Sequence, residues 1–196
     1  MRIYLTLQAV REKLGKNLLK NPCAASNFEG WTIVSDGGWA CEEKPSGCKP
    51  VKEAEGESCW STSYQDCEKK QVIDLDFEGF DPDYMDEIGP KIKFSEWFGS
   101  RGYASCVYWL TVRLLNSDMK MVYEKTFKET RVAEAKGNWY KVEGSFGSYG
   151  PGVRFIEYSH GGRDTCYWAG NFGAKITCSF VAVVAEAETS PSSDEN

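Results

Sequence analysis

Three tryptophans stand where a strand core is not expected. Trp60 lies in the polar stretch ESCWSTSYQ, and Trp97 follows Glu96 and precedes FGSRG. Trp168 lies beside Tyr167 in DTCYWAGNFGAK. Exposed aromatic rings near carboxylates and amides can bind a sugar, because the apolar face of a pyranose stacks on a ring while its hydroxyls donate to carboxylate oxygens. The same residue types form hot spots of protein–protein interfaces, so both kinds of binding site stay open at this point.

The neighbouring rings of Tyr167 and Trp168 predict a turn. Successive side chains of a strand point to opposite faces, so a strand core buries only one of two neighbouring residues. Glycines at 161, 162, 170 and 173 bracket the pair, and glycine marks turns. We therefore expect both rings at the tip of a loop.

The sequence offers little that would support catalysis. His160 is the single histidine, and its context SHGG predicts a strand end that leads into a turn. Nucleophile-elbow, P-loop and zinc-protease motifs are absent. Asp74, Asp76 and Glu78 alternate with apolar residues, which predicts a solvated strand face. We expect a binding protein and not an enzyme, with no cofactor.

The eight cysteines predict neither a metal site nor a disulfide framework. No C-x2-C pair occurs, and a zinc site would need thiolates at irregular spacing. A chain of 196 residues can also bury a sizeable core without staples. We expect reduced cysteines and no metal.

The overall composition limits the partners and the compartment. A net charge of −6 and a pI near 5.0 argue against nucleic acid and anionic membranes as partners. No apolar run approaches the roughly 20 residues of a membrane span, and the first residues do not resemble a signal peptide. We expect a single cytoplasmic domain.

The chain reads as one helix followed by many strands. Apolar residues near helical spacing predict a helix over 2–20, which Asn21-Pro22 ends. Short turns and no helical segments separate the strands that follow, which favours an antiparallel sandwich over an α/β sheet. The expected strands lie within 28–40 and at 71–77, 90–98, 105–115, 121–129, 138–146, 152–160 and 175–185.

Several blocks together resemble a known family. They are KNLLKNPC, QVIDL, KFSEWFGSR, CVYWLTVRLL, YGPGVRFIEYSHGGRD and CYWAGNFGAKIT. In order and wording they are similar to the F-box-associated domain of the sugar-recognising F-box proteins, over about residues 16–185. The resemblance implies a jelly-roll-like, galactose-binding-like β-sandwich that binds the chitobiose core of high-mannose N-glycans. It also implies substrate recognition for an SCF ubiquitin ligase in the endoplasmic-reticulum-associated degradation of misfolded glycoproteins.

The same resemblance implies which residues bind the glycan. Tyr167 and Trp168 match the aromatic pair of the family's pocket, Trp60 falls at a Phe, and Glu96 and Trp97 fall at an Asp-Trp pair. Two positions depart from the family pattern, which puts glycan preference in question. Ala169 replaces a lysine that donates to the ligand, and Asn171 replaces a further aromatic residue.

The resemblance further implies a division of the chain. Residues 1–20 match the end of a linker helix with no F-box evident, 21–185 the F-box-associated domain, and 186–196 a disordered acidic tail. We expect Skp1 and cullin as partners only if an F-box lies outside this sequence. The main alternative is an F-box-associated domain that binds a protein surface without sugar specificity.

Overall fold

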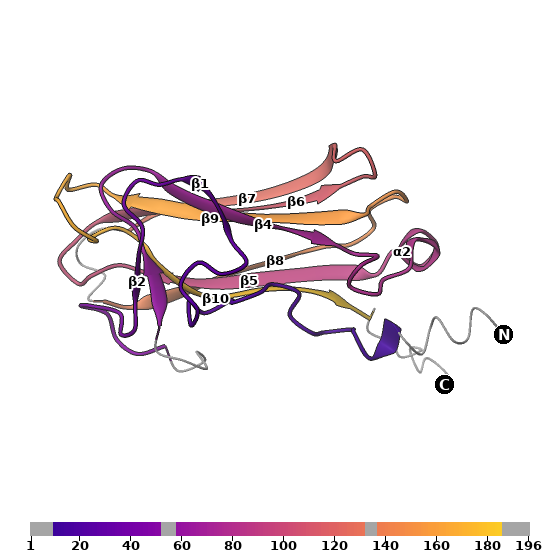
Figure 1. Ribbon diagram of the computed structural model, residues 1–196, viewed down its shortest axis with the longest axis horizontal. Coiled ribbons are helices and arrows are strands. Elements are labelled where there is room, and N and C mark those ends of the chain that lie inside the picture. The colour runs from indigo at the N-terminus through magenta and orange to yellow at the C-terminus, as the bar shows by residue number, and fades with distance from the viewer. Residues whose placement is uncertain (1–9, 52–57, 132–136, 186–196) are drawn as a thin grey trace, which may run out of the picture.

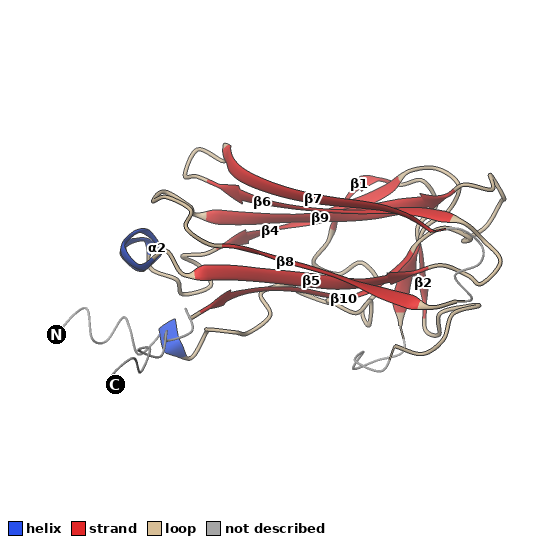
Figure 2. Cartoon of the chain, turned by 180° about the vertical axis from the view of Figure 1, so that it is seen from behind, coloured by secondary structure: helices blue, strands red, loops and turns tan. Residues whose placement is uncertain are grey.

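The computed structural model describes residues 10–51, 58–131 and 137–185, which form two antiparallel five-stranded sheets packed face to face (Figure 1). The strand order of the first sheet is β1 (Thr32–Ser35), β4 (Cys67–Asp74), β9 (Phe155–Asp164), β6 (Cys106–Leu115) and β7 (Met121–Arg131). The order of the second is β2 (Ala40–Glu42), β3 (Cys59–Ser61), β10 (Lys175–Val184), β5 (Lys91–Gly99) and β8 (Trp139–Phe146). Strands dominate both layers (Figure 2), which confirms the predicted all-β sandwich.

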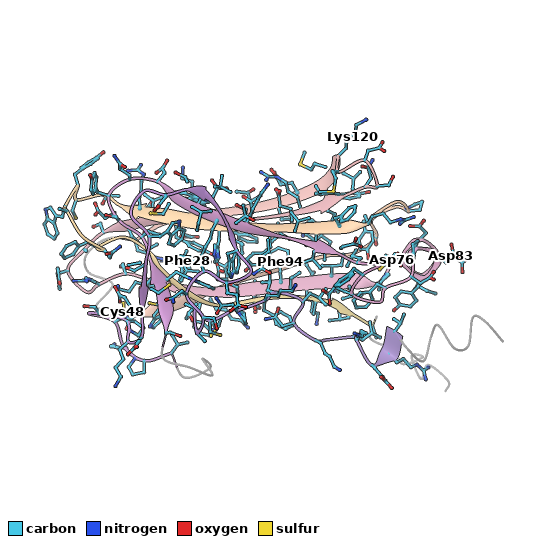
Figure 3. The ribbon with its side chains drawn as sticks, viewed as in Figure 1. Phe28, Cys48, Asp76, Asp83, Phe94 and Lys120 are labelled. Atoms are coloured by element: carbon cyan, nitrogen blue, oxygen red, sulfur yellow. The ribbon has the colours of Figure 1, made fainter. Side chains whose placement is uncertain are left out.

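The core lies between the two sheets and follows from strand alternation. On β5, Ile92, Phe94 and Phe98 point inward and are at most 1% exposed. They face Leu110 and other buried residues of β6, and Figure 3 shows Phe94 between the layers. Glu96 shares their alternation, so its carboxyl group also points into the core. The Glu96 side chain, which was predicted to bind a ligand, therefore lies in the interior.

The predicted N-terminal helix is wrong in its described part. Only residues 10 and 11 are helical, and residues 2–9 lie outside the described ranges. The amide of Leu18 instead donates to the carbonyl of Val181 on β10, at 2.9 Å. Since β3 pairs with only the first part of β10, this segment covers the remaining edge of that strand. Pairing with an open sheet edge outweighs a weak helical pattern.

A short helix, α2 (Pro82–Ile88), lies between β4 and β5. No helix is expected there from the strand pattern, yet the sequence carries the signals for one. The Asp81 side chain caps the N-terminus by accepting from the amide of Asp83 at 2.9 Å. Gly89 ends the helix with φ of +56°, a left-handed conformation that glycine adopts at little cost.

The predicted strand face at Asp74, Asp76 and Glu78 is wrong beyond its first residue. β4 ends at Asp74, whose carboxylate accepts from the amides of Asp76 and Phe77 at 3.1 Å each. Such local side-chain hydrogen bonds are typical of turns. The turn lies at the same end of the sandwich as α2, where Figure 3 labels Asp76 and Asp83.

The prediction of a turn at SHGG is also wrong. His160, Gly161 and Gly162 lie inside β9 and pair with β4 and β6. A Cβ atom at Gly161 would lie 2.1 Å from the carbonyl oxygen of Cys67 and 2.8 Å from the Trp109 ring. Glycine is therefore required here for close packing and not for chain reversal.

No helix among the described residues is long and apolar enough to cross a membrane. Within the same ranges, no group of three or more His, Cys, Asp or Glu side chains is arranged to hold a metal ion.

Candidate functional site

The loop between β9 and β10 presents two aromatic rings to solvent. Tyr167 is 74% exposed and Trp168 is 47% exposed. Asp164, the last residue of β9, is buried, and its Oδ1 accepts from the amides of Cys166 and Tyr167 at 2.9 and 2.7 Å. This turn holds Tyr167 at φ of +57°. The pair lies outside the strands, as predicted, at the end of the sandwich opposite α2 (Figure 1).

The far side of the same loop is fixed by several hydrogen bonds. Ser63 Oγ donates to the carbonyl of Gly170 at 2.6 Å, and Asn171 Nδ2 donates to the carbonyl of Gly38 at 2.8 Å. The amide of Gly173 donates to the carbonyl of Thr62 at 3.0 Å. The rings therefore stand on a loop whose backbone is held at both ends, which lowers the entropy that binding would cost.

Three further side chains extend this aromatic surface. Trp168 meets Phe172 edge to face, with ring centroids 5.5 Å apart, and Phe172 lies 6.3 Å from Tyr103 of the β5–β6 loop. The guanidinium carbon of Arg101 stands 4.5 Å from the Phe172 centroid. We call Arg101, Tyr103, Tyr167, Trp168 and Phe172 the loop cluster. Sequence reasoning missed Arg101, Tyr103 and Phe172, although RGY and NFG both place an aromatic residue beside a glycine in a turn.

Trp60 is not part of this surface. It is fully buried, its indole Nε1 donates to the carbonyl of Asn27 at 2.7 Å, and its ring meets Trp31 edge to face at 5.2 Å. The interpretation of Trp60 as an exposed ring is therefore wrong. It lies on β3, where each residue is buried.

Glu96 also lies in the interior, as its alternation on β5 requires. Its carboxylate is fully buried and accepts hydrogen bonds from four side chains. The donors are Tyr108 at 2.7 Å, Tyr158 at 3.3 Å, His160 Nδ1 at 2.5 Å and Ser179. A carboxylate enclosed in this way has no free side to offer a surface ligand.

His160 joins Glu96 to a buried lysine. Its Nδ1 bonds to Glu96, so Nδ1 carries the proton and Nε2 accepts from Lys69 Nζ at 2.5 Å. Burial lowers the pKa of His160 to about 4, against the favourable effect of Glu96, so the ring is neutral at pH 7. Burial also lowers the pKa of Lys69, whose amine stands 3.5 Å from the Trp31 ring centroid and 3.1 Å from that of Trp60. His160 is thus a core residue that links three strands.

Trp97 stands on the outer face of the second sheet. It pairs with Lys141 of β8 and Thr177 of β10, and it lines a hollow with Trp139, Asn138 and residues 49–51. The five residues predicted for one site therefore occupy three places. Tyr167 and Trp168 share the loop cluster, Trp97 lies on the sheet face, and Trp60 and Glu96 are buried.

Comparison with known proteins assigns the chain to a family. Residues 9–183 match the family described as "F-box associated region". The chain is 38% identical over 179 residues to F-box only protein 2 of Bos taurus and 34% identical over 172 residues to F-box only protein 27 of Mus musculus. Each match covers 87% of this chain and 60% of the relative, so the chain spans about 60% of the length of these relatives.

Solved structures support the fold alone. A carbohydrate-binding module titled "TmCBM61 in complex with beta-1,4-galactotriose" superposes with a TM-score of 0.54 at 15% identity, covering 86% of this chain and 99% of that one. An enzymatically active domain of a bacteriophage CBA120 tailspike protein superposes with a TM-score of 0.55 at 13% identity, covering 86% of this chain and 21% of that one. Through its sequence match over residues 9–183, this chain belongs to the F-box associated region family.

Proposed function

We propose that this chain is the glycan-binding domain of an SCF-type ubiquitin ligase adaptor. Its ligand is the chitobiose core of high-mannose N-glycans on misfolded glycoproteins, in the cytoplasmic stage of endoplasmic-reticulum-associated degradation. Membership of the F-box associated region family supports the adaptor role. The observation that carries the sugar-binding role is the exposed Tyr167–Trp168 pair on a loop that Asp164 fixes.

The proposed binding mode rests on stacking. The Trp168 indole is the largest ring of the loop cluster and would pack against a pyranose, with the more exposed Tyr167 ring beside it. Trp60 and Glu96 take no direct part because both are fully buried. The side-chain amide of Asn171 donates to Gly38 and to Ser61, so it serves the loop rather than a ligand.

The proposal describes a binding protein and not an enzyme. His160, the single imidazole, is buried in the core and already bonded through both ring nitrogens. Contact with Skp1 and cullin would require an F-box, which the resemblance does not place in this sequence. The chain alone is therefore proposed to capture the substrate.

A second candidate function is recognition of a protein surface. It is favoured by the exposed phenol of Tyr103, because tyrosine, tryptophan and arginine together are typical of interface hot spots. A glycan array with the purified chain separates the two. Signal confined to glycans with a chitobiose or high-mannose core supports sugar recognition, and a blank array favours the protein-binding alternative.

Trp168→Ala tests the proposed binding mode. We expect it to weaken chitobiose binding by about 2 kcal/mol or more, in the range of a hot-spot residue, with the thermal midpoint nearly unchanged. The loss should exceed that of Tyr167→Ala, because the indole offers the larger stacking face. Calorimetric titration measures both.

Phe77→Ala is a matched control for this test. Phe77 is an 82% exposed ring in the turn near α2, at the opposite end of the sandwich, and its removal should not change binding. If Trp168→Ala binds chitobiose like the parent, or unfolds the domain, Trp168 is not the sugar platform.

A further inference from the structure

Arg101 brings a positive charge to the loop cluster and is held in place on several sides. Its Cγ would lie 3.2 Å from a Cβ atom added at Gly47, so the side-chain stem packs against the backbone there. The guanidinium stands over Phe172, and its Nη1 donates to the hydroxyl of Tyr103 at 3.2 Å. Figure 3 labels Cys48, the neighbour of Gly47, at the end of the sandwich opposite Asp76 and Asp83.

Arg101 differs from four other arginines in what surrounds its charge. Arg113, Arg131, Arg154 and Arg163 each contact a carboxylate within 4.0 Å. Among the residues that the structure describes, Arg101 has no such ion pair. The Arg101 guanidinium is ordered and lies beside exposed rings, in a protein of net charge −6. It is therefore suited to donate a hydrogen bond to an acceptor atom of a ligand.

The geometry narrows the chemistry of that acceptor. Arg101 Nε is buried and has no hydrogen-bond partner in the described part of the chain, so the Nε–Nη2 edge is not open to a two-point contact. Nη1 is already shared with Tyr103. A carboxylate gains most from two parallel hydrogen bonds, which this arrangement disfavours. A single acceptor oxygen fits this arrangement better than a two-oxygen group, and the Tyr103 hydroxyl, which accepts from Arg101, keeps its own proton to donate.

We propose that Arg101 and Tyr103 form the polar arm of the glycan site and donate to the carbonyl oxygen of an N-acetyl group. This inference rests on the proposed function and assigns a source of selectivity to it. An amide carbonyl only accepts hydrogen bonds, which complements a guanidinium that only donates. Stacking on Trp168 accepts any pyranose with an apolar face. The hydrogen bonds from Arg101 and Tyr103 favour sugars that carry an N-acetyl group over sugars that do not.

The test compares two sugars that share a β-1,4-linked backbone. N,N′-diacetylchitobiose carries N-acetyl groups where cellobiose carries hydroxyls, so the ratio of their dissociation constants reports the polar arm. We expect Arg101→Met to weaken chitobiose binding by about tenfold to a hundredfold, because it removes a hydrogen bond from a charged donor. Tyr103→Phe removes a hydrogen bond from a neutral hydroxyl and should weaken binding by about twofold to tenfold. Cellobiose binding should change by less than about twofold, because stacking is kept.

Both substitutions keep most of the packing of the original side chain, so a loss of binding can be told apart from a loss of folding. Methionine keeps an unbranched stem against Gly47, and phenylalanine keeps the ring of Tyr103. Arg163→Met is the control, because Arg163 lies at the end of β9 but is paired with Asp66 at 3.1 Å. It should change neither sugar, and thermal midpoints of all variants should match the parent.

The outcomes separate this inference from the proposed function. Unchanged chitobiose binding, or equal losses for both sugars, overturns the role of Arg101 and Tyr103 while leaving glycan binding intact. Binding of the acidic trisaccharide 3′-sialyllactose in preference to chitobiose, lost in Arg101→Met, would show that the acceptor is a carboxylate and also overturns it. A parent protein that binds no chitobiose overturns the proposed function and the inference with it.

Discussion

Glu96→Gln tests whether the carboxylate predicted at a sugar site instead holds the core together. Oε1 accepts from Tyr158, His160 and Ser179, and Oε2 accepts from Tyr108. A glutamine presents one oxygen and one amide nitrogen, so at least one of these donors meets another donor. The substitution also removes the negative charge that lies nearest to the Lys69–His160 pair.

The cost can be estimated from the burial of the group. Removing one member of a buried charged network costs about 3–5 kcal/mol, because the groups bonded to it are left buried without their partner. We therefore expect Glu96→Gln to lower the free energy of unfolding by about 3 kcal/mol or more. In a domain of this size 1 kcal/mol shifts Tm by about 2–4 °C, so Tm should fall by about 6–12 °C.

Urea unfolding followed by tryptophan fluorescence measures this change, with Glu143→Gln as the control. Glu143 lies on the neighbouring strand β8 and forms an exposed ion pair with Lys141 at 3.0 Å, so its loss should cost less than about 0.5 kcal/mol. Combining Glu96→Gln with Lys69→Met should cost at least about 1 kcal/mol less than the two single changes added together, because the residues share one network. A Glu96→Gln protein as stable as the parent would refute the assignment of Glu96 to the core.

Two further predictions concern pH and oxidation. Burial lowers the pKa of His160 from the ordinary value of 6.5 to about 4. As pH falls from 6.5 to about 4, the His160 ring therefore binds a proton in the unfolded chain but not in the folded one, which favours unfolding. The unfolding free energy should fall by about 2 kcal/mol between pH 7 and pH 5, and a flat profile over this range in urea unfolding would contradict the burial of a neutral His160. The Sγ atoms of Cys23 and Cys178 lie 3.6 Å apart and both residues are partly exposed, so oxidised glutathione should link them first. Peptide mapping should find this disulfide in the parent and in Cys166→Ser, and glutathione adducts alone would argue against it.

The strand framework could be predicted because it rests on local patterns. β5 and β6 differ from the expected ranges by one residue at each end or less, since their alternation of apolar and polar residues is regular. α2 is not predicted from strand alternation, although its start and stop signals, Asp81 and Gly89, are present in the sequence. Residues 10–20 were misjudged because their partner, the open edge of β10, is set by tertiary structure.

The candidate site was predicted in part, and the errors have a common cause. Tyr167 and Trp168 were recognised as a loop pair because glycines bracket them and a strand with one buried face buries only one of two neighbouring rings. Glu96 was assigned to the site because the resemblance matches it to the Asp of an Asp-Trp pair, although Ile92, Phe94 and Phe98 already show that even-numbered residues of β5 point inward. For this residue the register of the strand was the better guide to its position.

The buried network and the exposed loop cluster are connected through the strands. The contact of His160 with Glu96 joins β9 of one sheet to β5 of the other, close to the ends of both strands. β9 ends four residues later at Asp164, which shapes the turn before Trp168, and β5 ends three residues later at Gly99, just before Arg101. We expect this hydrogen bond between the sheets to restrict the spacing of the two loops that carry the rings and the guanidinium. Glu96 would then influence ligand binding through the position of those loops and not through contact with a sugar.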